Sequence, residues 1–348
     1  MPASFKISIV CLFVLVSPVK SADVVRLLAE GARNPVGTIT EISATEVKIL
    51  RTGSSAPTVV SAVEIAATQF DQEPPLLTAM RTAILGSRFS DVLEMTQRLD
   101  PATIGNPFAR QDYDYFRAFA LGQIALTLPD NAGPSHQDNL QKAIAACTEF
   151  LRTHPKSYHY FPICELTGEL YQLAGNRENA FQSYSLLAKA PWPVFRLKAA
   201  LALGTIRLDE EKFAEAEKFF ASVRATAEQS EDALRAVAEA EIGLAKCLIR
   251  QGDFKTAIEQ LEGLSMKGHP EDARLQAAIH LTLGEAYEAA ANPKEAILAY
   301  LHVEILYPSA KAEYRSALKR LAVLWTKVNR PERAAEAEKN LREMRAVP

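Results

Sequence analysis

Histidines, cysteines and paired carboxylates are the residues that could carry out chemistry in this chain, and none of them forms a catalytic pattern. The six histidines include no close pair at the spacing that binds a metal from a helix. His154 and His159 only flank the turn-like segment PKSY. A glycine-rich phosphate loop and a G-x-S-x-G nucleophile motif are both absent from the sequence. We therefore expect a protein that is not an enzyme and that uses no metal or cofactor.

Other polar and aromatic features have structural explanations. In QDYDYF at 111–116, Asp112 and Asp114 lie near the start of an expected helix, where carboxylates complement the helix dipole. The segment DEEK at 209–212 is typical of a solvated turn. Trp192 stands between two prolines and is either a residue that packs a turn, which we favour, or an exposed anchor for a partner.

The N-terminal segment, residues 1–22, has the layout of a secretory signal peptide. Lys6 supplies a positive start, residues 7–16 form a short apolar run, and the small residues Ser21 and Ala22 follow. The run is too short to cross a bilayer, which takes about 20 residues. The sequence thus predicts a secreted or periplasmic protein without a stable membrane span in the mature chain, and an uncleaved anchor is the alternative.

The charge of the mature chain argues against a nucleic acid partner. Removal of the N-terminal segment, with its two lysines, changes the formal charge from −3 to −5. An acidic chain without a basic run is a poor candidate for binding nucleic acid. Three cysteines would remain, Cys147, Cys164 and Cys247, each of which is best explained as a small core residue. A disulfide between Cys147 and Cys164 stays open.

The pattern of the chain changes near residue 72. Residues 23–72 contain short segments rich in β-branched residues, VGTITEIS, EVKILRT and PTVVS, separated by turn-like residues. Val47 and Ile49 alternate with Glu46 and Lys48, which is the period of a half-buried strand. We expect four or five short antiparallel strands, in a small domain that resembles an SH3-like or Sm-like unit. Residues 73–348 have helical periodicity, starting at the helix-initiating prolines 74 and 75.

Small residues recur through the helical part at a fixed spacing. Five pairs lie twelve residues apart, and their first members are 36, 41, 39 and 38 residues apart. The pairs are Gly168 and Ala180, Gly204 and Ala216, Ala245 and Ala257, Gly284 and Ala296, and Ala322 and Ala334. Such a period predicts a solenoid of helical hairpins. We expect the small residues to lie where the two helices of a hairpin cross, because larger side chains would hold the backbones apart.

The segment LGEAYEAAANPKEAILAYLHVEILYP at 283–308 resembles a tetratricopeptide repeat. Leu283–Gly284, Tyr287, Ala296, Tyr300 and Pro308 stand at that family's characteristic positions. Units at 166–187, 203–223 and 244–264 are similar, with Arg207 where an aromatic residue is usual, and earlier units are more degenerate. The resemblance implies a mostly α fold with about seven hairpins over residues 73–348. In the last unit Glu338 replaces the aromatic residue, as suits a capping repeat.

The resemblance also implies a binding surface, because the first helix of each unit lines the concave face in this family. Residues spaced four and three apart share one helix face, and the corresponding sets are mixed apolar and acidic. They are Phe119, Gln123 and Leu126; Glu165, Glu169 and Gln172; Leu201, Thr205 and Leu208; Ile242, Lys246 and Ile249; and Leu281, Glu285 and Glu288.

These features together favour an interaction protein. The leading hypothesis is a scaffold of the bacterial-type cell envelope that binds a basic or amphipathic peptide or helix in the groove. The alternative is an accessory module for cell-wall or outer-membrane assembly. A groove that is merely solvated, or filled by the protein's own chain, is equally compatible with the sequence.

Overall fold

The computed structural model describes residues 22–127, 134–226, 231–267 and 271–346. The predicted signal peptide therefore falls almost wholly outside the described residues. The chain forms two compact units, one up to Phe116 and one from Arg117 onward. The first unit contains the sheet together with the first helices that follow it, and a domain boundary after residue 72 stays a prediction. None of the helices within the described ranges is long and apolar enough to cross a membrane.

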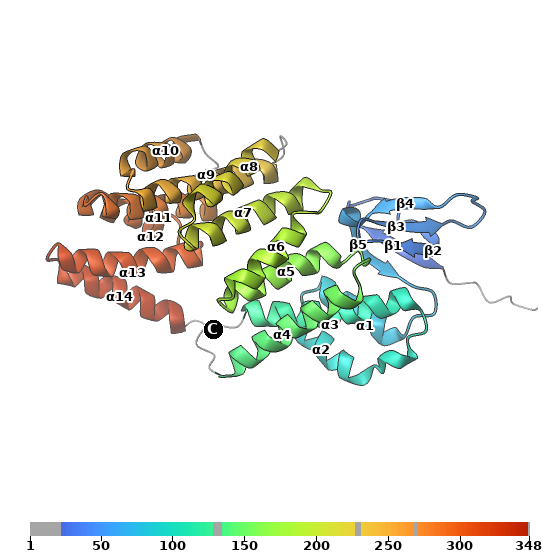
Figure 1. The fold of residues 1–348 in the computed structure, drawn as a ribbon. Coiled ribbons are helices and arrows are strands. Elements are labelled where there is room, and N and C mark those ends of the chain that lie inside the picture. The colour runs from blue at the N-terminus through green and yellow to red at the C-terminus, as the bar shows by residue number, and fades with distance from the viewer. Residues whose placement is uncertain (1–21, 128–133, 227–230, 268–270, 347–348) are drawn as a thin grey trace, which may run out of the picture. The chain divides into compact units, whose positions relative to one another are not determined.

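The first unit is built on a five-stranded antiparallel sheet with the order β4-β3-β2-β1-β5, which confirms the predicted β unit (Figure 1). In β3, Val47 and Ile49 are fully buried while the residues between them are partly exposed, as the alternation predicts. The short 3₁₀ turn η1 (Ala62–Glu64) connects β4 to β5, which returns to pair with β1. The strands are β1 (Asp23–Leu27), β2 (Val36–Ile42), β3 (Glu46–Leu50), β4 (Thr58–Ser61) and β5 (Ile65–Gln69).

Helices α1 (Pro75–Leu85) and α2 (Phe89–Arg98), the 3₁₀ turn η2 (Pro101–Thr103) and the first part of α3 (Pro107–Thr127) complete this unit. A buried ion group joins them to the sheet. Arg81 of α1 donates to both carboxylate oxygens of Glu73, at 2.5 and 2.8 Å, and to Asp112 of α3 at 3.4 Å. Thr68 of β5 also donates to Asp112, at 3.0 Å. Asp112 thus has a different role from the predicted dipole complement, because it lies beyond the first turn of α3 and is buried.

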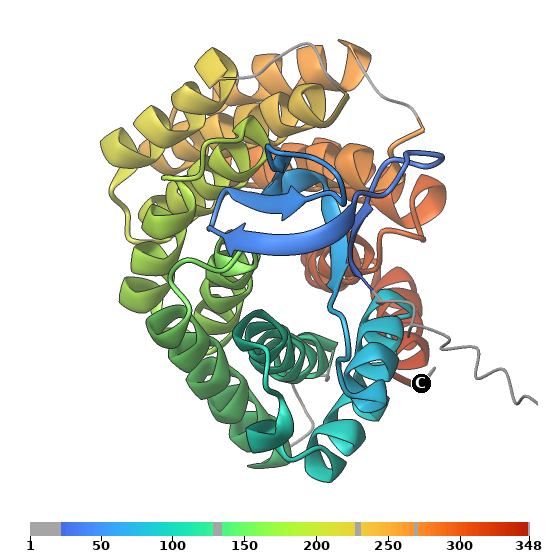
Figure 2. The ribbon, with the colours of Figure 1, turned by 90° about the vertical axis from the view of Figure 1, so that its right-hand side faces the viewer.

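The second unit consists of helical hairpins that follow one another in a curved row (Figure 2). In the five hairpins from α5 to α14 the two helices pack against each other, and the first helices α7, α9, α11 and α13 also contact in sequence. The helices are α4 (Pro134–Thr153), α5 (Tyr160–Leu173), α6 (Arg177–Leu187), α7 (Pro193–Asp209), α8 (Phe213–Thr226), α9 (Glu231–Gln251), α10 (Phe254–Lys267), α11 (Ala273–Ala289), α12 (Pro293–Leu306), α13 (Lys311–Lys327) and α14 (Pro331–Ala346). The predicted α-solenoid is confirmed.

The turns inside the hairpins share one backbone geometry. A residue with φ between 58° and 89° follows the first helix of five successive hairpins. The next N–H then donates to the carbonyl five residues earlier, as Asn292 does to Tyr287 at 2.8 Å. The five residues are Gly175, Glu211, Gly252, Ala291 and Asn329, and their spacings of 36, 41, 39 and 38 equal those of the sequence repeat.

The crossing residues are small for a reason that differs in part from the expectation. Ala180, Ala216, Ala257 and Ala296 are all fully buried, as expected. The glycines, however, face the large side chain four residues after the alanine rather than the alanine itself. A Cβ on Gly284 would lie 2.3 Å from the ring of Tyr300, and one on Gly204 would lie 2.6 Å from the ring of Phe220. Glycine therefore makes room for an aromatic ring in the three hairpins that have glycine at the crossing, those of Gly168, Gly204 and Gly284.

Arg207, the departure from the aromatic pattern, is explained by stacking. Its guanidinium lies 3.8 Å from the centre of the Phe181 ring and donates to Glu210 at 2.5 Å. The planar group thus covers an aromatic face as a ring would.

Candidate functional site

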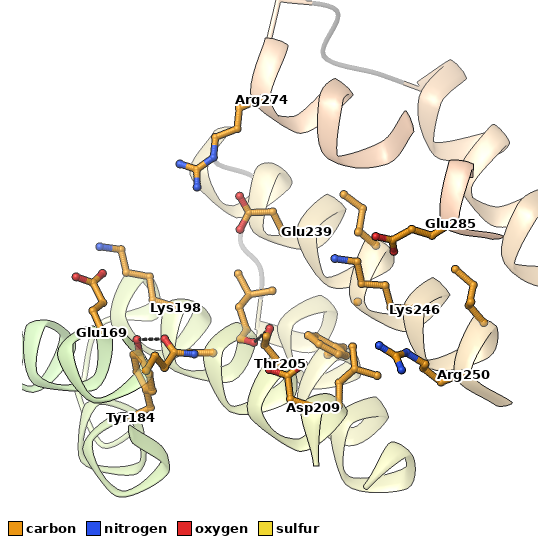
Figure 3. Close-up of a pocket in the computed structure, with 18 of the residues that line it drawn as sticks. Glu169, Tyr184, Lys198, Thr205, Asp209, Glu239, Lys246, Arg250, Arg274 and Glu285 are labelled. Atoms are coloured by element: carbon orange, nitrogen blue, oxygen red, sulfur yellow. Dashed lines mark hydrogen bonds between the residues drawn. The ribbon is translucent and has the colours of Figure 1, made fainter. Parts of the chain in front are cut away.

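The candidate site is a cavity of about 790 Å³ in the second unit, formed where the first helices α5, α7, α9 and α11 present successive faces (Figure 3). It is lined by Glu165, Glu169, Gln172, Tyr184, Lys198, Leu201, Ala202, Thr205, Leu208, Asp209, Phe220, Glu239, Ile242, Gly243, Lys246, Ile249, Arg250, Arg274 and Glu285. All but Tyr184 and Phe220 come from these four helices. Helical hairpins in register therefore bring residues more than a hundred positions apart to one surface.

Most of the predicted groove residues lie in this cavity. Seven of the proposed site residues line it: Glu165, Glu169, Gln172, Thr205, Leu208, Lys246 and Glu285. Their apolar neighbours Leu201, Ile242 and Ile249 line it too. Phe119, Gln123 and Leu126 of α3 and Leu281 and Glu288 of α11 are not among the lining residues. A binding role for any of these residues stays a prediction.

Two of the predicted residues also have structural roles. The Tyr184 hydroxyl donates to Gln172 at 2.8 Å, and the Tyr300 hydroxyl donates to Glu288 at 3.3 Å. Both acceptors stand twelve residues before their tyrosine, so they are equivalent positions in two repeats. Glu288 also forms an ion pair with Arg320 of α13, at 3.0 Å. Gln172 and Glu288 therefore satisfy the polar end of an otherwise buried ring.

The acidic end of the cavity lies on α5. Glu165 pairs with Lys198 of α7 at 2.7 Å, which neutralises one carboxylate. Glu169, one turn further along α5, makes no ion pair within the described part of the chain. Burial raises the pKa of Glu169 above its ordinary value, the neighbouring Glu165 raises it further, and Lys198 partly opposes the shift. A cation brought to Glu169 would stabilise its charged form.

The cavity holds more positive charge than the sequence indicated. Lys198, Arg250 and Arg274 line it in addition to Lys246, and Glu239 and Asp209 add two further carboxylates (Figure 3). The groove is thus mixed in charge as well as apolar, rather than apolar and acidic. Helix periodicity could have found most of these residues, because Lys198 and Glu239 each stand three positions before a predicted residue and Arg250 four positions after Lys246.

The remaining chemical candidates pack the fold. The rings of His154 and His159 lie 5.1 Å from Phe150 and 3.8 Å from Tyr158 respectively. Trp192 contacts the rings of two phenylalanines at 5.9 Å each, which agrees with packing of a turn. Cys147, Cys164 and Cys247 are buried free thiols. In the part of the chain that the structure describes, no cluster of three or more histidine, cysteine or acidic side chains could hold a metal ion.

Comparison with known proteins identifies the repeat. Residues 207–279 match the tetratricopeptide repeat family, over α8 to α10 and parts of the helices on either side. The sequence matches no curated protein.

Several solved structures are similar to the chain at low sequence identity. A tetratricopeptide repeat protein from Parabacteroides merdae ATCC 43184 has a TM-score of 0.55 and 18% identity, over 77% of this chain and 91% of that one. The apo form of RapI has a TM-score of 0.50 and 14% identity, over 77% and 74% of the two chains. A Rap protein complexed with Competence and Sporulation Factor has a TM-score of 0.51 and 12% identity, over 78% and 75%. These similarities show that the helical region has the tetratricopeptide-repeat fold.

Proposed function

We propose that this protein is a non-enzymatic scaffold that binds a peptide or helix of a partner protein in the cavity of α5, α7, α9 and α11. The tetratricopeptide-repeat fold is typical of protein–protein interaction and is not typical of catalysis. The observation that carries the proposal is the shared cavity, which collects seven of the eleven residues predicted for the groove from four successive helices. Its lining of both apolar and charged side chains suits a segment of the same mixed character.

The proposed partner segment is amphipathic, with basic side chains directed toward α5. Five carboxylates and four cations line the cavity, so its formal charge is slightly negative. One of the similar structures, the Rap protein, is a complex with Competence and Sporulation Factor, which supports the idea that a fold of this kind can hold a bound factor. We also propose that the protein acts outside the cytoplasm, which rests on the signal-peptide pattern of residues 1–22.

Affinity capture with matched variants tests the proposal. The full chain would be expressed with a C-terminal tag in its own cells, and its partners identified by mass spectrometry after capture from the cell-envelope fraction. Glu165→Lys with Glu285→Lys changes the groove, and Glu178→Lys with Glu332→Lys makes the same charge change on exposed residues outside it. We expect the first variant to lose partners that the second retains. Loss of none, or an equal loss from both variants, would overturn the groove as the binding site.

The cellular location has its own measurement. Mass spectrometry of the protein isolated from the envelope fraction should show a mature N-terminus near residue 22. A full-length chain recovered only from the cytoplasm would contradict the proposed export.

A further inference from the structure

We propose that the groove selects an extended peptide by the order of its charged side chains, which is basic, then acidic, then basic. One residue position, repeated in successive first helices, contacts these side chains. This inference rests on the proposed function and adds the character and direction of the ligand. The position is the residue that follows the small residue of each first helix. It is Glu169 on α5, Thr205 on α7, Lys246 on α9 and Glu285 on α11, and all four line the same cavity.

These four residues are equivalent in the repeat, so they form a row across the helices. Each directly follows its crossing residue, at 168, 204, 245 and 284. Figure 3 shows Glu169, Thr205, Lys246 and Glu285 on successive helices around one opening. Adjacent packed helices lie roughly 8–10 Å apart. A ligand lying across the helices therefore meets a carboxylate, a hydroxyl, an ammonium group and a carboxylate in turn.

The charged members of the row form no ion pair within the described part of the fold. Glu169, Lys246 and Glu285 make no ion pair among the residues that the structure describes. By contrast, the cavity cations Lys198 and Arg274 lie 2.7 and 3.7 Å from carboxylates on neighbouring helices. Three charges of alternating sign are thus available to a ligand, while the neighbouring Lys198 and Arg274 are already paired.

The surroundings of Lys246 strengthen its interaction with an acidic ligand group. Lys246 is only partly exposed and stands between buried Ile242 and partly buried Ile249 on the same face of α9. Charge pairs are stronger beside apolar surface than in open water. Arg250 lies one turn further along α9, makes no ion pair within the described ranges, and adds positive charge on the same side. Its place in the last turn also complements the helix dipole, but Lys246 lies too far from the end of α9 for that role.

The spacing of the row sets the spacing of charges in the ligand. Two helix steps separate Glu169 from Lys246. The usual separation of packed helices, applied to both steps, gives roughly 16–20 Å, although α7 packs directly against α9 whereas α5 reaches α7 chiefly through α6. An extended chain rises roughly 3.3 Å per residue, so a basic and an acidic side chain should stand about five or six residues apart. One further step to Glu285 predicts a second basic side chain about three residues beyond the acidic one. Because the two intervals differ, the pattern has a direction.

Selection from a displayed library of random 16-residue peptides tests this inference. The bait is the full chain, and the readout is the sequence of the enriched peptides. We expect enrichment of a basic residue, then an acidic residue five or six positions away, then a basic residue about three positions further. Enriched peptides without that order would overturn the inference and leave the proposed function standing. No enrichment of any peptide would overturn the proposed function itself.

Exchanging two charges of the row tests whether these residues determine the charge order of the selected peptides. Glu169→Lys with Lys246→Glu reverses the first two charges without changing the net charge, and Lys218→Glu with Glu332→Lys is the matched control at exposed positions outside the cavity. We expect the first variant to select peptides with the acidic and basic residues exchanged, and the control to select the original order. The same order from both variants would overturn the assignment.

A measurement on the unaltered protein does not depend on how these variants fold. The best peptide is synthesised in its selected form and with its acidic and first basic residues exchanged. We expect the exchanged peptide to bind at least tenfold more weakly, because each charge then meets its own sign. Equal affinity of the two peptides would overturn the inference.

Discussion

Replacement of Gly284 by alanine tests the packing argument on which the solenoid depends. The new Cβ would lie 2.3 Å from a ring carbon of Tyr300, far inside van der Waals contact. Tyr300 is fully buried, so its ring cannot swing into solvent. Overpacking of this kind costs about 1–3 kcal/mol, whereas alanine gains about 1 kcal/mol over glycine in helix propensity. We expect a net loss of stability of about 1–2 kcal/mol, because the clash lies at the severe end of the range.

Gly263 provides the matched control for this substitution. It lies in α10, and a Cβ placed there meets nothing within 4 Å. Gly263→Ala should therefore raise stability by up to about 1 kcal/mol through helix propensity alone. Thermal and urea unfolding of the full chain, followed by circular dichroism, gives both changes. A difference of 1 kcal/mol corresponds to a shift in Tm of about 2–4 °C for a unit of this size.

A second substitution, at Tyr300, separates the clash with the tyrosine ring from the other effects of placing alanine at position 284. Tyr300→Leu shortens the facing side chain, and Gly284→Ala with Tyr300→Leu recreates the pair that Ala245 and Leu261 already form in the neighbouring repeat. We expect the loss caused by Gly284→Ala to shrink or vanish in the Tyr300→Leu background. If Gly284→Ala stabilises the protein as much as Gly263→Ala does, the glycine is not a packing requirement and the reasoning fails.

Three further predictions address other parts of the fold. Arg81→Met leaves buried carboxylates without their cation and should cost about 3–5 kcal/mol in urea unfolding, whereas loss of an exposed pair through Lys142→Met should cost less than about 1 kcal/mol. Burial, and then the neighbouring imidazole of His302, lowers the pKa of His280 to about 4. The unfolded chain therefore binds a proton at this histidine before the folded protein does, so stability present above pH 6.5 should be lost as the pH falls toward 4. His280→Gln should flatten this dependence of Tm on pH. Ala291→Gly should raise stability by about 1 kcal/mol, because Ala291 has a φ of 60° where Gly252 stands in the preceding hairpin.

Local periodicity is enough to predict the repeats and the strands, because both follow from side chains close in sequence. The alternation in β3 and the spacing of the small residues each correspond to one face of one element. The buried ion group of Arg81 was not predicted, because its partners are brought together only by the fold of the first unit. Arg274 was missed in the groove for a related reason, since it stands more than one helical turn from any predicted residue and only the fold brings it to the cavity, whereas Lys198 could have been found three positions before Leu201.

The repeats can also be compared with one another, and certain pairs of positions vary together. Where the crossing residue is glycine, the facing residue is aromatic at 184, 220 and 300, and where it is alanine the facing residue is Leu261 or Glu338. Where the aromatic residue is tyrosine, a polar residue twelve positions earlier accepts its hydroxyl, as Gln172 does for Tyr184, and Phe220 has Leu208 in that place. Both pairings occur at a fixed residue spacing, so they can be detected in the sequence. Their physical cause is the packing of the two helices within a hairpin.

Comparison of the repeats also distinguishes positions that pack the hairpins from positions that face the cavity. The crossing positions and their facing residues vary together, because a change in one alters the space for the other. The row of Glu169, Thr205, Lys246 and Glu285 varies in charge from repeat to repeat, and its three charged members make no ion pair among the described residues. The alternating charges of this row are therefore best explained by what binds against it, which is why exchanging two of them should change the ligand and leave the solenoid intact.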